Sequence, residues 1–208
     1  GLGAKRNRRT FSGSLWDADE DGDLDLIVVS DFSGVDLYEN YGEGHFKDIT
    51  EQAFDERANF GMGHSFADFN ADGHMDLYVT GMSSTTARRL EALGLKRDGF
   101  PAVNDQRMAM AYGNRLYLGN GKGQFRQPDY KDSVARSGWS WGVSHFDFGN
   151  DGRLDFYVAN GHRSGETCKD YCTRFWTHDV YVAKTDSQEK LLKVFDLDFQ
   201  PLLWNLGV

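Results

Sequence analysis

The chain has 208 residues, of which 39% are hydrophobic and 14% aromatic, so it can bury a core and is not expected to be disordered. Its net charge of −9 argues against a nucleic-acid-binding surface and favours cations as partners. It contains no run of about 18 apolar residues, so no membrane-spanning helix is expected. Its 24 glycines and three prolines favour short elements joined by tight turns, which is typical of β structure.

The first strongly acidic stretch is DADEDGDLD at residues 17–25, and the hydrophobic run LIVVS follows it. The pattern recurs as DFNADGHMD at 68–76 and as DFGNDGRLD at 147–155, followed by LYVTG and FYVAN. All three copies have Asp at positions 1, 5 and 9, Gly at position 6, and Ser three residues before the first Asp. Three copies with matching flanks indicate an internal structural repeat.

A second shared block follows the acidic one. VDLYENYGEGHF at 35–46 matches NRLYLGNGKGQF at 114–125, and HDVYVAK at 178–184 is the candidate equivalent in the third copy. Each unit therefore predicts four antiparallel strands: one entering the acidic loop, one leaving it, and a hairpin with a Gly-x-Gly turn. This is the composition of a β-propeller blade, so we expect an all-β fold.

Residues 1–208 are expected to form part of one propeller domain, with three blades at about 11–60, 61–136 and 137–208. Their uneven spacing predicts two excursions. The first, at 82–113, contains TTARRLEALGLKR, whose leucine spacing predicts a short amphipathic helix over 85–97.

The second excursion, at 161–177, holds the two cysteines of the chain, Cys168 and Cys172. Their spacing favours a local disulfide in an oxidising compartment, with two unrelated buried thiols as the alternative. A metal site with two cysteines would need two further ligands, which the sequence does not show.

Each acidic loop has the donor spacing of an oxygen-only cation site. Side chains at positions 1, 3, 5 and 9 and the carbonyl of position 7 face inward, while Gly at position 6 permits a sharp bend. Such donors favour calcium over zinc or copper, and suit it better than magnesium. The predicted ligands are Asp17, Asp19, Asp21, Asp23 (carbonyl) and Asp25 in the first loop, Asp68, Asn70, Asp72, His74 (carbonyl) and Asp76 in the second, and Asp147, Asp151, Arg153 (carbonyl) and Asp155 in the third.

An EF-hand also begins with D-x-D-x-D-G, but it needs Glu at position 12 and helices on both sides. Position 12 is Val28, Val79 or Val158, within runs that favour strands, which excludes an EF-hand. In the third loop Gly149 stands at position 3 without a side chain, so either water completes a weaker site or the loop keeps its shape without metal. For the other two loops, a metal-free acidic turn is the alternative.

The D-x-D-x-D-G-x-x-D motif, the Leu-Tyr-Val strand and NRLYLGNGKGQF together resemble the FG-GAP or VCBS repeat over about residues 11–184. The wider sequence at 61–95 and 138–162 is similar to the cartilage-acidic-protein-type (ASPIC-like) branch. The resemblance implies a calcium-loop β-propeller, as in the integrin α-subunit head and many secreted bacterial proteins. Such propellers close with about seven blades, so the resemblance implies that other chains, or the rest of a longer polypeptide, complete the ring.

The sequence contains no G-x-S-x-G elbow, H-E-x-x-H helix or phosphate-binding loop, so an enzyme is not expected. We expect a calcium-binding scaffold, structural or protein-binding, that is extracellular, periplasmic or at the cell surface. The alternatives are a carbohydrate-binding propeller of lectin type, whose partners are glycans, and an accessory domain of a secreted enzyme. Nucleic acid is not an expected partner.

Overall fold

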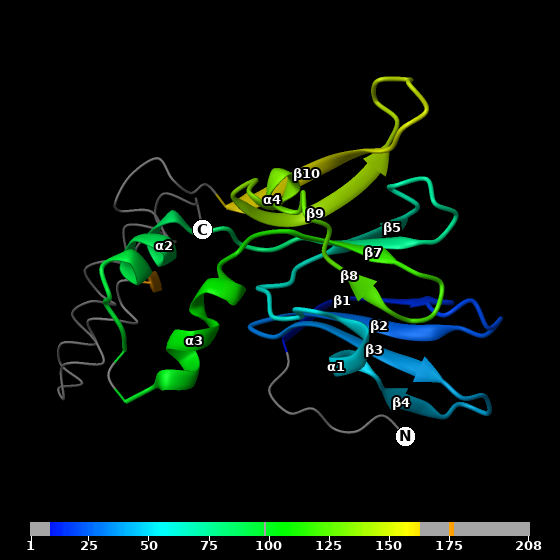
Figure 1. The fold of residues 1–208 in the computed structure, drawn as a ribbon, viewed down its shortest axis with the longest axis horizontal. Coiled ribbons are helices and arrows are strands. Elements are labelled where there is room, and N and C mark those ends of the chain that lie inside the picture. Colours follow the sequence, from blue (N-terminus) through cyan, green and yellow to red (C-terminus); the bar gives the residue numbers. More distant parts are fainter. Residues whose placement is uncertain (1–8, 98, 163–174, 177–208) are drawn as a thin grey trace, which may run out of the picture. The chain divides into compact units, whose positions relative to one another are not determined.

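The computed structural model describes residues 9–97, 99–162 and 175–176. These belong to two compact units, one formed by residues 1–83 with 109–162 and the other by residues 84–108 with 163–208. The first unit contains three antiparallel sheets (Figure 1). Within the described residues, no helix combines the length and the apolar character needed to cross a membrane.

The first two sheets each have four strands in sequence order, as the repeat predicts. The first sheet consists of β1 (Arg9–Trp16), β2 (Asp25–Asp31), β3 (Gly34–Asn40) and β4 (Phe46–Asp48). The second consists of β5 (His64–Ala67), β6 (Asp76–Val79), β7 (Arg115–Gly119) and β8 (Phe125–Arg126). The expected all-β class and blade-like strand order are therefore confirmed.

The third sheet pairs β9 (Trp139–Phe146) with β10 (Asp155–His162). These are the two strands on either side of the third acidic loop. The predicted third strand of this copy, at 178–184, lies outside the described residues. Two short helices also belong to the first unit, α1 (Thr50–Ala53) and α4 (Asp132–Ala135).

The main core lies between the first and second sheets. Alternate residues of β2 are buried, which is the pattern of a strand with one face on a core. Ile27 and Leu37 of the first sheet belong to the same buried cluster as Leu77, Tyr117 and Phe125 of the second. Burying each of these side chains stabilises the fold by about 1.5–3 kcal/mol, so the core holds neighbouring sheets together as well as each sheet by itself.

The second unit contains the helix predicted in the first excursion, α2 (Thr85–Ala92). The Ser84 hydroxyl accepts a hydrogen bond from the Ala87 amide and caps its N-terminus. The helix ends earlier than the predicted boundary at 97 because Gly94 adopts φ of +65°. The Leu95 amide then bonds to the Leu90 carbonyl at 2.9 Å, which is a Schellman cap.

A second helix, α3 (Pro101–Met110), begins in the second unit and was not expected from the sequence. Proline at its first position needs no amide partner there, which suits a helix start. The guanidinium of Arg107 is buried and donates to the Leu95 carbonyl at 2.7 Å. The excursion at 82–113 is therefore a helical segment with its own polar contacts.

Candidate metal centre

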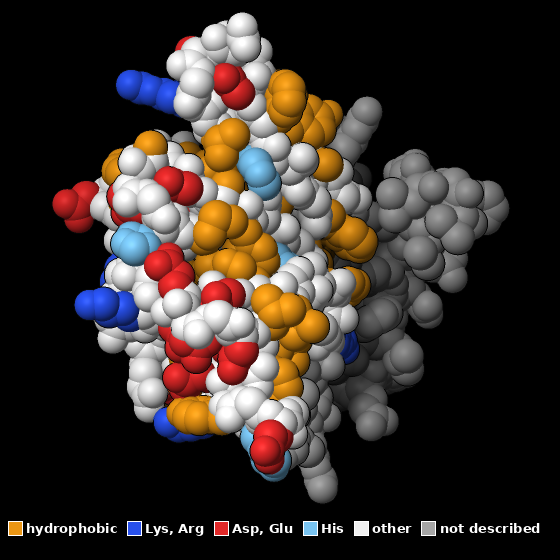
Figure 2. All heavy atoms as spheres, turned by 90° about the vertical axis from the view of Figure 1, so that its right-hand side faces the viewer, with side chains coloured by type: hydrophobic (Ala, Val, Ile, Leu, Met, Phe, Trp, Pro, Cys, Tyr) orange, Lys and Arg blue, Asp and Glu red, His pale blue; other side chains and the backbone are white. Residues whose placement is uncertain are grey.

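The strand register places the three acidic loops at equivalent points. In each sheet the residue before the loop pairs with position 9: Trp16 with Asp25, Ala67 with Asp76, and Phe146 with Asp155. Figure 1 shows the three loops at the same end of the sheets. Figure 2 looks onto that end, where acidic side chains gather beside hydrophobic ones.

The Asp at position 1 organises each loop by accepting two backbone hydrogen bonds. Asp17 accepts from the Asp21 and Gly22 amides, both at 3.1 Å. Asp68 and Asp147 make the same pair of bonds in their loops, at 2.8–3.1 Å. The loops therefore share one backbone frame, which their own side chains determine.

Positions 4 and 6 supply the sharp bend, because both lie in the left-handed region of backbone conformation. Position 6 is glycine, for which φ values of 82° to 98° carry no steric penalty. Position 4 is not glycine in any loop, although its φ is 51° to 60°, which is uncommon for other residues. The position-4 residues are Glu20, Ala71 and Asn150.

The Asp at position 9 ties the first two loops to the third strand of their sheets. Asp25 accepts from the Ala18 amide at 2.9 Å and from the Asn40 amide, at the end of β3, at 2.8 Å. Asp76 makes the equivalent bonds to Phe69 and to Gly119 at the end of β7, both at 2.9 Å. Both carboxylates are buried, and burial is the main reason that their pKa values are raised.

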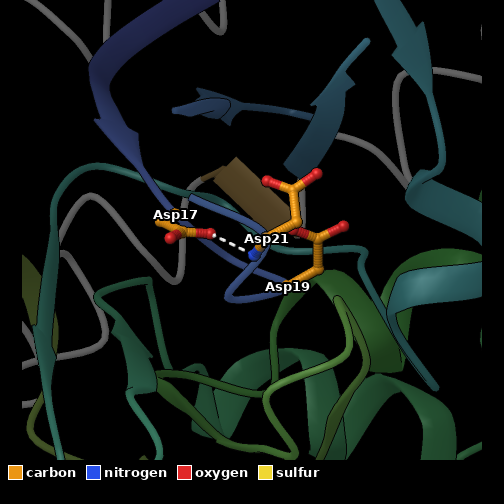
Figure 3. A group of neighbouring side chains, drawn as sticks. All are labelled: Asp17, Asp19 and Asp21. Atoms are coloured by element: carbon orange, nitrogen blue, oxygen red, sulfur yellow. Dashed lines mark hydrogen bonds between the residues drawn. The ribbon is translucent and has the colours of Figure 1, made fainter. Parts of the chain in front are cut away.

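The first loop concentrates negative charge. One carboxylate oxygen each of Asp17, Asp19 and Asp21 lies within 4.8 Å of the other two. Figure 3 shows these three side chains in the first loop. One oxygen each of Asp19 and Asp23 is buried and has no hydrogen-bond partner among the described residues. Loss of hydration, followed by the charges of nearby carboxylates, raises the pKa of both groups. Buried acceptors without donors are the environment that a hard cation satisfies, so the first loop fits calcium.

The second loop has fewer carboxylates and more internal compensation. The Asn70 amide group donates to Asp72 at 2.8 Å. Asp72 also accepts from the His74 backbone amide at 2.9 Å, and this bond is the main reason that its pKa is lowered. The same donor positions are present in the sequence of this loop, with an amide oxygen in place of one carboxylate.

The third loop keeps the frame but lacks one donor. Asp151 accepts from the Arg153 amide at 2.9 Å, as position 5 does in the other loops. Position 3 is Gly149, so a side-chain oxygen is missing where Asp19 stands in the first loop. Asp155 accepts from the Phe148 amide at 3.1 Å and is exposed, unlike its buried counterparts.

The first and second loops also contact each other, which the sequence does not reveal. The Nδ1 atom of His74 lies 2.8 Å from Oε1 of Glu20. The Gly123 amide of the second hairpin donates to the Ala18 carbonyl at 3.2 Å. Glu20 stands at a position that does not ligate in the predicted pattern, so no motif draws attention to it.

The structure brings Asp17, Asp19 and Asp21 of the first loop together. The predicted ligand Asp25 is not in that group, and its two oxygens accept from the Ala18 and Asn40 amides. Cys168 and Cys172 lie outside the described residues, so their predicted disulfide stays a prediction. The chemical capacity of the site is that of cation binding by oxygen donors.

The sheets and loops define a class: repeat proteins built from β-propeller blades with an acidic loop between the first two strands. The FG-GAP-like repeat family matches residues 17–79 and 102–158, which is more than half of the chain. The chain therefore belongs to the FG-GAP-like repeat family. No curated protein matches it significantly.

Proposed function

We propose that this chain is a calcium-binding propeller repeat that acts as a scaffold, structural or protein-binding, outside the cytoplasm or at the cell surface. The observation that carries the proposal is in the first loop, where a buried side-chain oxygen of the proposed ligand Asp19 has no hydrogen-bond donor among the described residues. A side-chain oxygen of Asp23, which is not itself a proposed ligand atom, is in the same situation and adds negative charge to the loop. Calcium supplies the positive charge that offsets their repulsion. The chain supplies the rest, because the Asp17 and Asp21 side chains hold the loop backbone in place.

The proposed ligands of the first loop are Asp17, Asp19, Asp21, Asp25 and the Asp23 carbonyl. Their equivalents in the second loop are Asp68, Asn70, Asp72, Asp76 and the His74 carbonyl. The third loop offers Asp147, Asp151, Asp155 and the Arg153 carbonyl, and we propose that it binds calcium more weakly because Gly149 contributes no donor. Calcium sites of extracellular modules have dissociation constants of about 10⁻⁴ to 10⁻³ M, which is the range that we propose here.

The test is the unfolding of the 208-residue chain in urea, in EDTA and in calcium. At a calcium concentration of about 100 times the dissociation constant, one site raises the free energy of unfolding by about 2.7 kcal/mol. Magnesium at the same concentration should give a smaller increase, because it demands a tighter octahedral shell. Equal stability in calcium and in EDTA would rule out the calcium proposal.

A pair of variants separates calcium binding from general charge effects. Asp19→Asn should reduce the stabilisation by calcium and should raise stability in EDTA, since it removes one of the repelling carboxylates. Asp129→Asn removes an exposed carboxylate outside the acidic loops and serves as the matched control. The same response to calcium in both variants would contradict the proposed role of Asp19.

The scaffold role is supported by the family and by hydrophobic side chains beside the loops. Leu15, Leu24 and Phe148 are each more than half exposed near the acidic positions, which is a surface suited to contact with protein. A glycan array probed with the calcium-loaded chain tests this role. A blank array is expected, and specific glycan binding would instead support a lectin.

A further inference from the structure

We propose that Glu20, which does not ligate calcium itself, couples calcium binding at the first loop to calcium binding at the second. This inference rests on the proposed calcium function. It assigns a positioning role to a residue outside the metal-binding pattern, and it makes the two sites positively cooperative.

The coupling contact is the pair formed by Glu20 and His74. Nδ1 of His74 lies 2.8 Å from Oε1 of Glu20. Because a carboxylate only accepts, the hydrogen bond uses a proton on Nδ1, which the charged ring and the Nδ1–H tautomer of the neutral ring both carry. The two side chains are 47% and 40% exposed, so the pair is weak as a source of stability. The pair matters for coupling because Glu20 and His74 belong to different calcium loops.

Each partner is rigidly connected to a proposed ligand set. Glu20 stands between Asp19 and Asp21, which are the ligands at positions 3 and 5 of the first loop. His74 supplies position 7 of the second loop through its own carbonyl, and its amide already bonds to Asp72. Calcium in the first loop restricts Glu20, and the pair then restricts His74. The second loop is therefore partly ordered before its own calcium binds, and the effect is reciprocal.

The hairpin turn of the second sheet leaves room for this pair. A Cβ atom at Gly121 would lie 2.6 Å from Nδ1 of His74 and 2.8 Å from the Glu20 carboxylate carbon. Gly42 holds the same position in the first hairpin, and a Cβ there would meet no atom within 4 Å. The turn at Gly121 therefore lies directly against the pair, and the Gly123 amide bonds to the Ala18 carbonyl.

The next loop boundary has no such pair. The residues equivalent to Glu20 and His74 are Ala71 in the second loop and Arg153 in the third. A methyl group cannot accept a hydrogen bond from a guanidinium, so the second and third loops lack this connection. The predicted cooperativity is therefore confined to the first two loops.

The experiment measures calcium affinity at each loop of the 208-residue chain by NMR. The amides of Gly22 and Gly73 report on the first and second loops, because they bond to Asp17 and Asp68 respectively. Asp19→Asn with Asp21→Asn disables the first loop. We expect this double change to weaken calcium binding at the second loop, as reported by the Gly73 amide, about two- to fivefold. This factor corresponds to the free energy that one exposed ion pair contributes.

The decisive variant is Glu20→Ala, which places at position 4 the residue that the second loop carries at the same φ of 60°. In the Glu20→Ala background, the double change that disables the first loop should no longer alter the calcium affinity of the second loop. Glu43→Ala is the matched control, because Glu43 is an exposed acidic residue at a φ of 52° in the first hairpin turn. Glu43→Ala should leave the two- to fivefold effect intact.

His74→Asn provides a second route to the same answer, since it removes the ring and keeps the backbone carbonyl. It should abolish the coupling as Glu20→Ala does. If disabling the first loop leaves Gly73 unaffected in the wild-type chain, or tightens its binding, the coupling is overturned while the calcium proposal stands. If neither glycine amide responds to calcium, the calcium proposal itself is overturned.

Discussion

The first and third acidic loops have the same hydrogen-bonded frame in different surroundings. Asp17 and Asp147 make the same two backbone contacts in their loops. Asp25, however, is 2% exposed and bonds to Asn40 at the end of β3, whereas Asp155 is exposed and bonds to its own loop. The comparison shows that nine residues are enough to shape the loop. In the first loop, the last carboxylate also accepts a hydrogen bond from the end of the third strand of its sheet.

The largest expected effect on stability comes from removing the last carboxylate of the first loop, and the same change in the third loop provides the comparison. Asp25→Ala leaves two amides without their acceptor and should lower the free energy of unfolding by about 2–4 kcal/mol. Asp155→Ala should cost clearly less, because solvent can replace its bond to Phe148. Urea unfolding in EDTA measures both losses without any contribution from metal. Equal losses would show that the burial of Asp25 is not what distinguishes the loops.

The same contrast explains what the sequence could predict. The positions of the strands and of the loop bend follow from spacing, because Asp17 and Gly22 act within a few residues of each other. The hydrogen bond from the Asn40 amide to Asp25 could not be predicted from the sequence. Asn40 lies 15 residues further along the chain and approaches Asp25 only because of the β2–β3 register. Glu20 and His74 were beyond prediction for the same reason, because they lie 54 residues apart and meet only through packing between sheets.

The helices show where local signals suffice and where they do not. The leucine spacing predicted α2, although the prediction ran past Gly94, whose positive φ ends the helix. α3 has a weak amphipathic pattern and was missed, although Pro101 is a common helix start. The blade boundaries and the metal ligands stay predictions.

An intermediate effect is expected from giving the third loop the donor that it lacks. Gly149 does not have a positive φ, and a Cβ there would make only an ordinary contact, at 3.8 Å from the Asp151 carboxylate carbon. Gly149→Asp should therefore fold normally and strengthen calcium binding at the third loop about tenfold, or about 1.4 kcal/mol. The Gly152 amide reports on this loop by NMR, because it bonds to Asp147.

Gly149→Ala is the control for the change in backbone freedom, and it should leave calcium affinity at the third loop unchanged. If Gly149→Asp binds calcium no better than Gly149→Ala, the missing donor is not what separates the third loop from the first. The exposed setting of Asp155 would then be the difference that matters.

The smallest expected effect on stability concerns a histidine at the contact between the first and second sheets. His64 on β5 lies 2.9 Å from the Ser12 hydroxyl and 2.8 Å from the Ser14 hydroxyl, both on β1. Burial lowers the pKa of His64, so the unfolded chain binds this proton more readily than the folded one. Its contribution to stability is then complete above the unfolded pKa of about 6.5 and is lost as the pH falls below that value.

Unfolding in urea between pH 8 and pH 5 should show this loss, and His64→Gln should remove part of the slope. A single proton limits the slope to about 1.4 kcal/mol per pH unit, and incomplete burial reduces it further. Ser14→Ala is the matched control, because it removes one hydrogen bond and keeps the titrating ring. It should lower stability similarly at every pH. If His64→Gln leaves the slope unchanged, His64 is not its source.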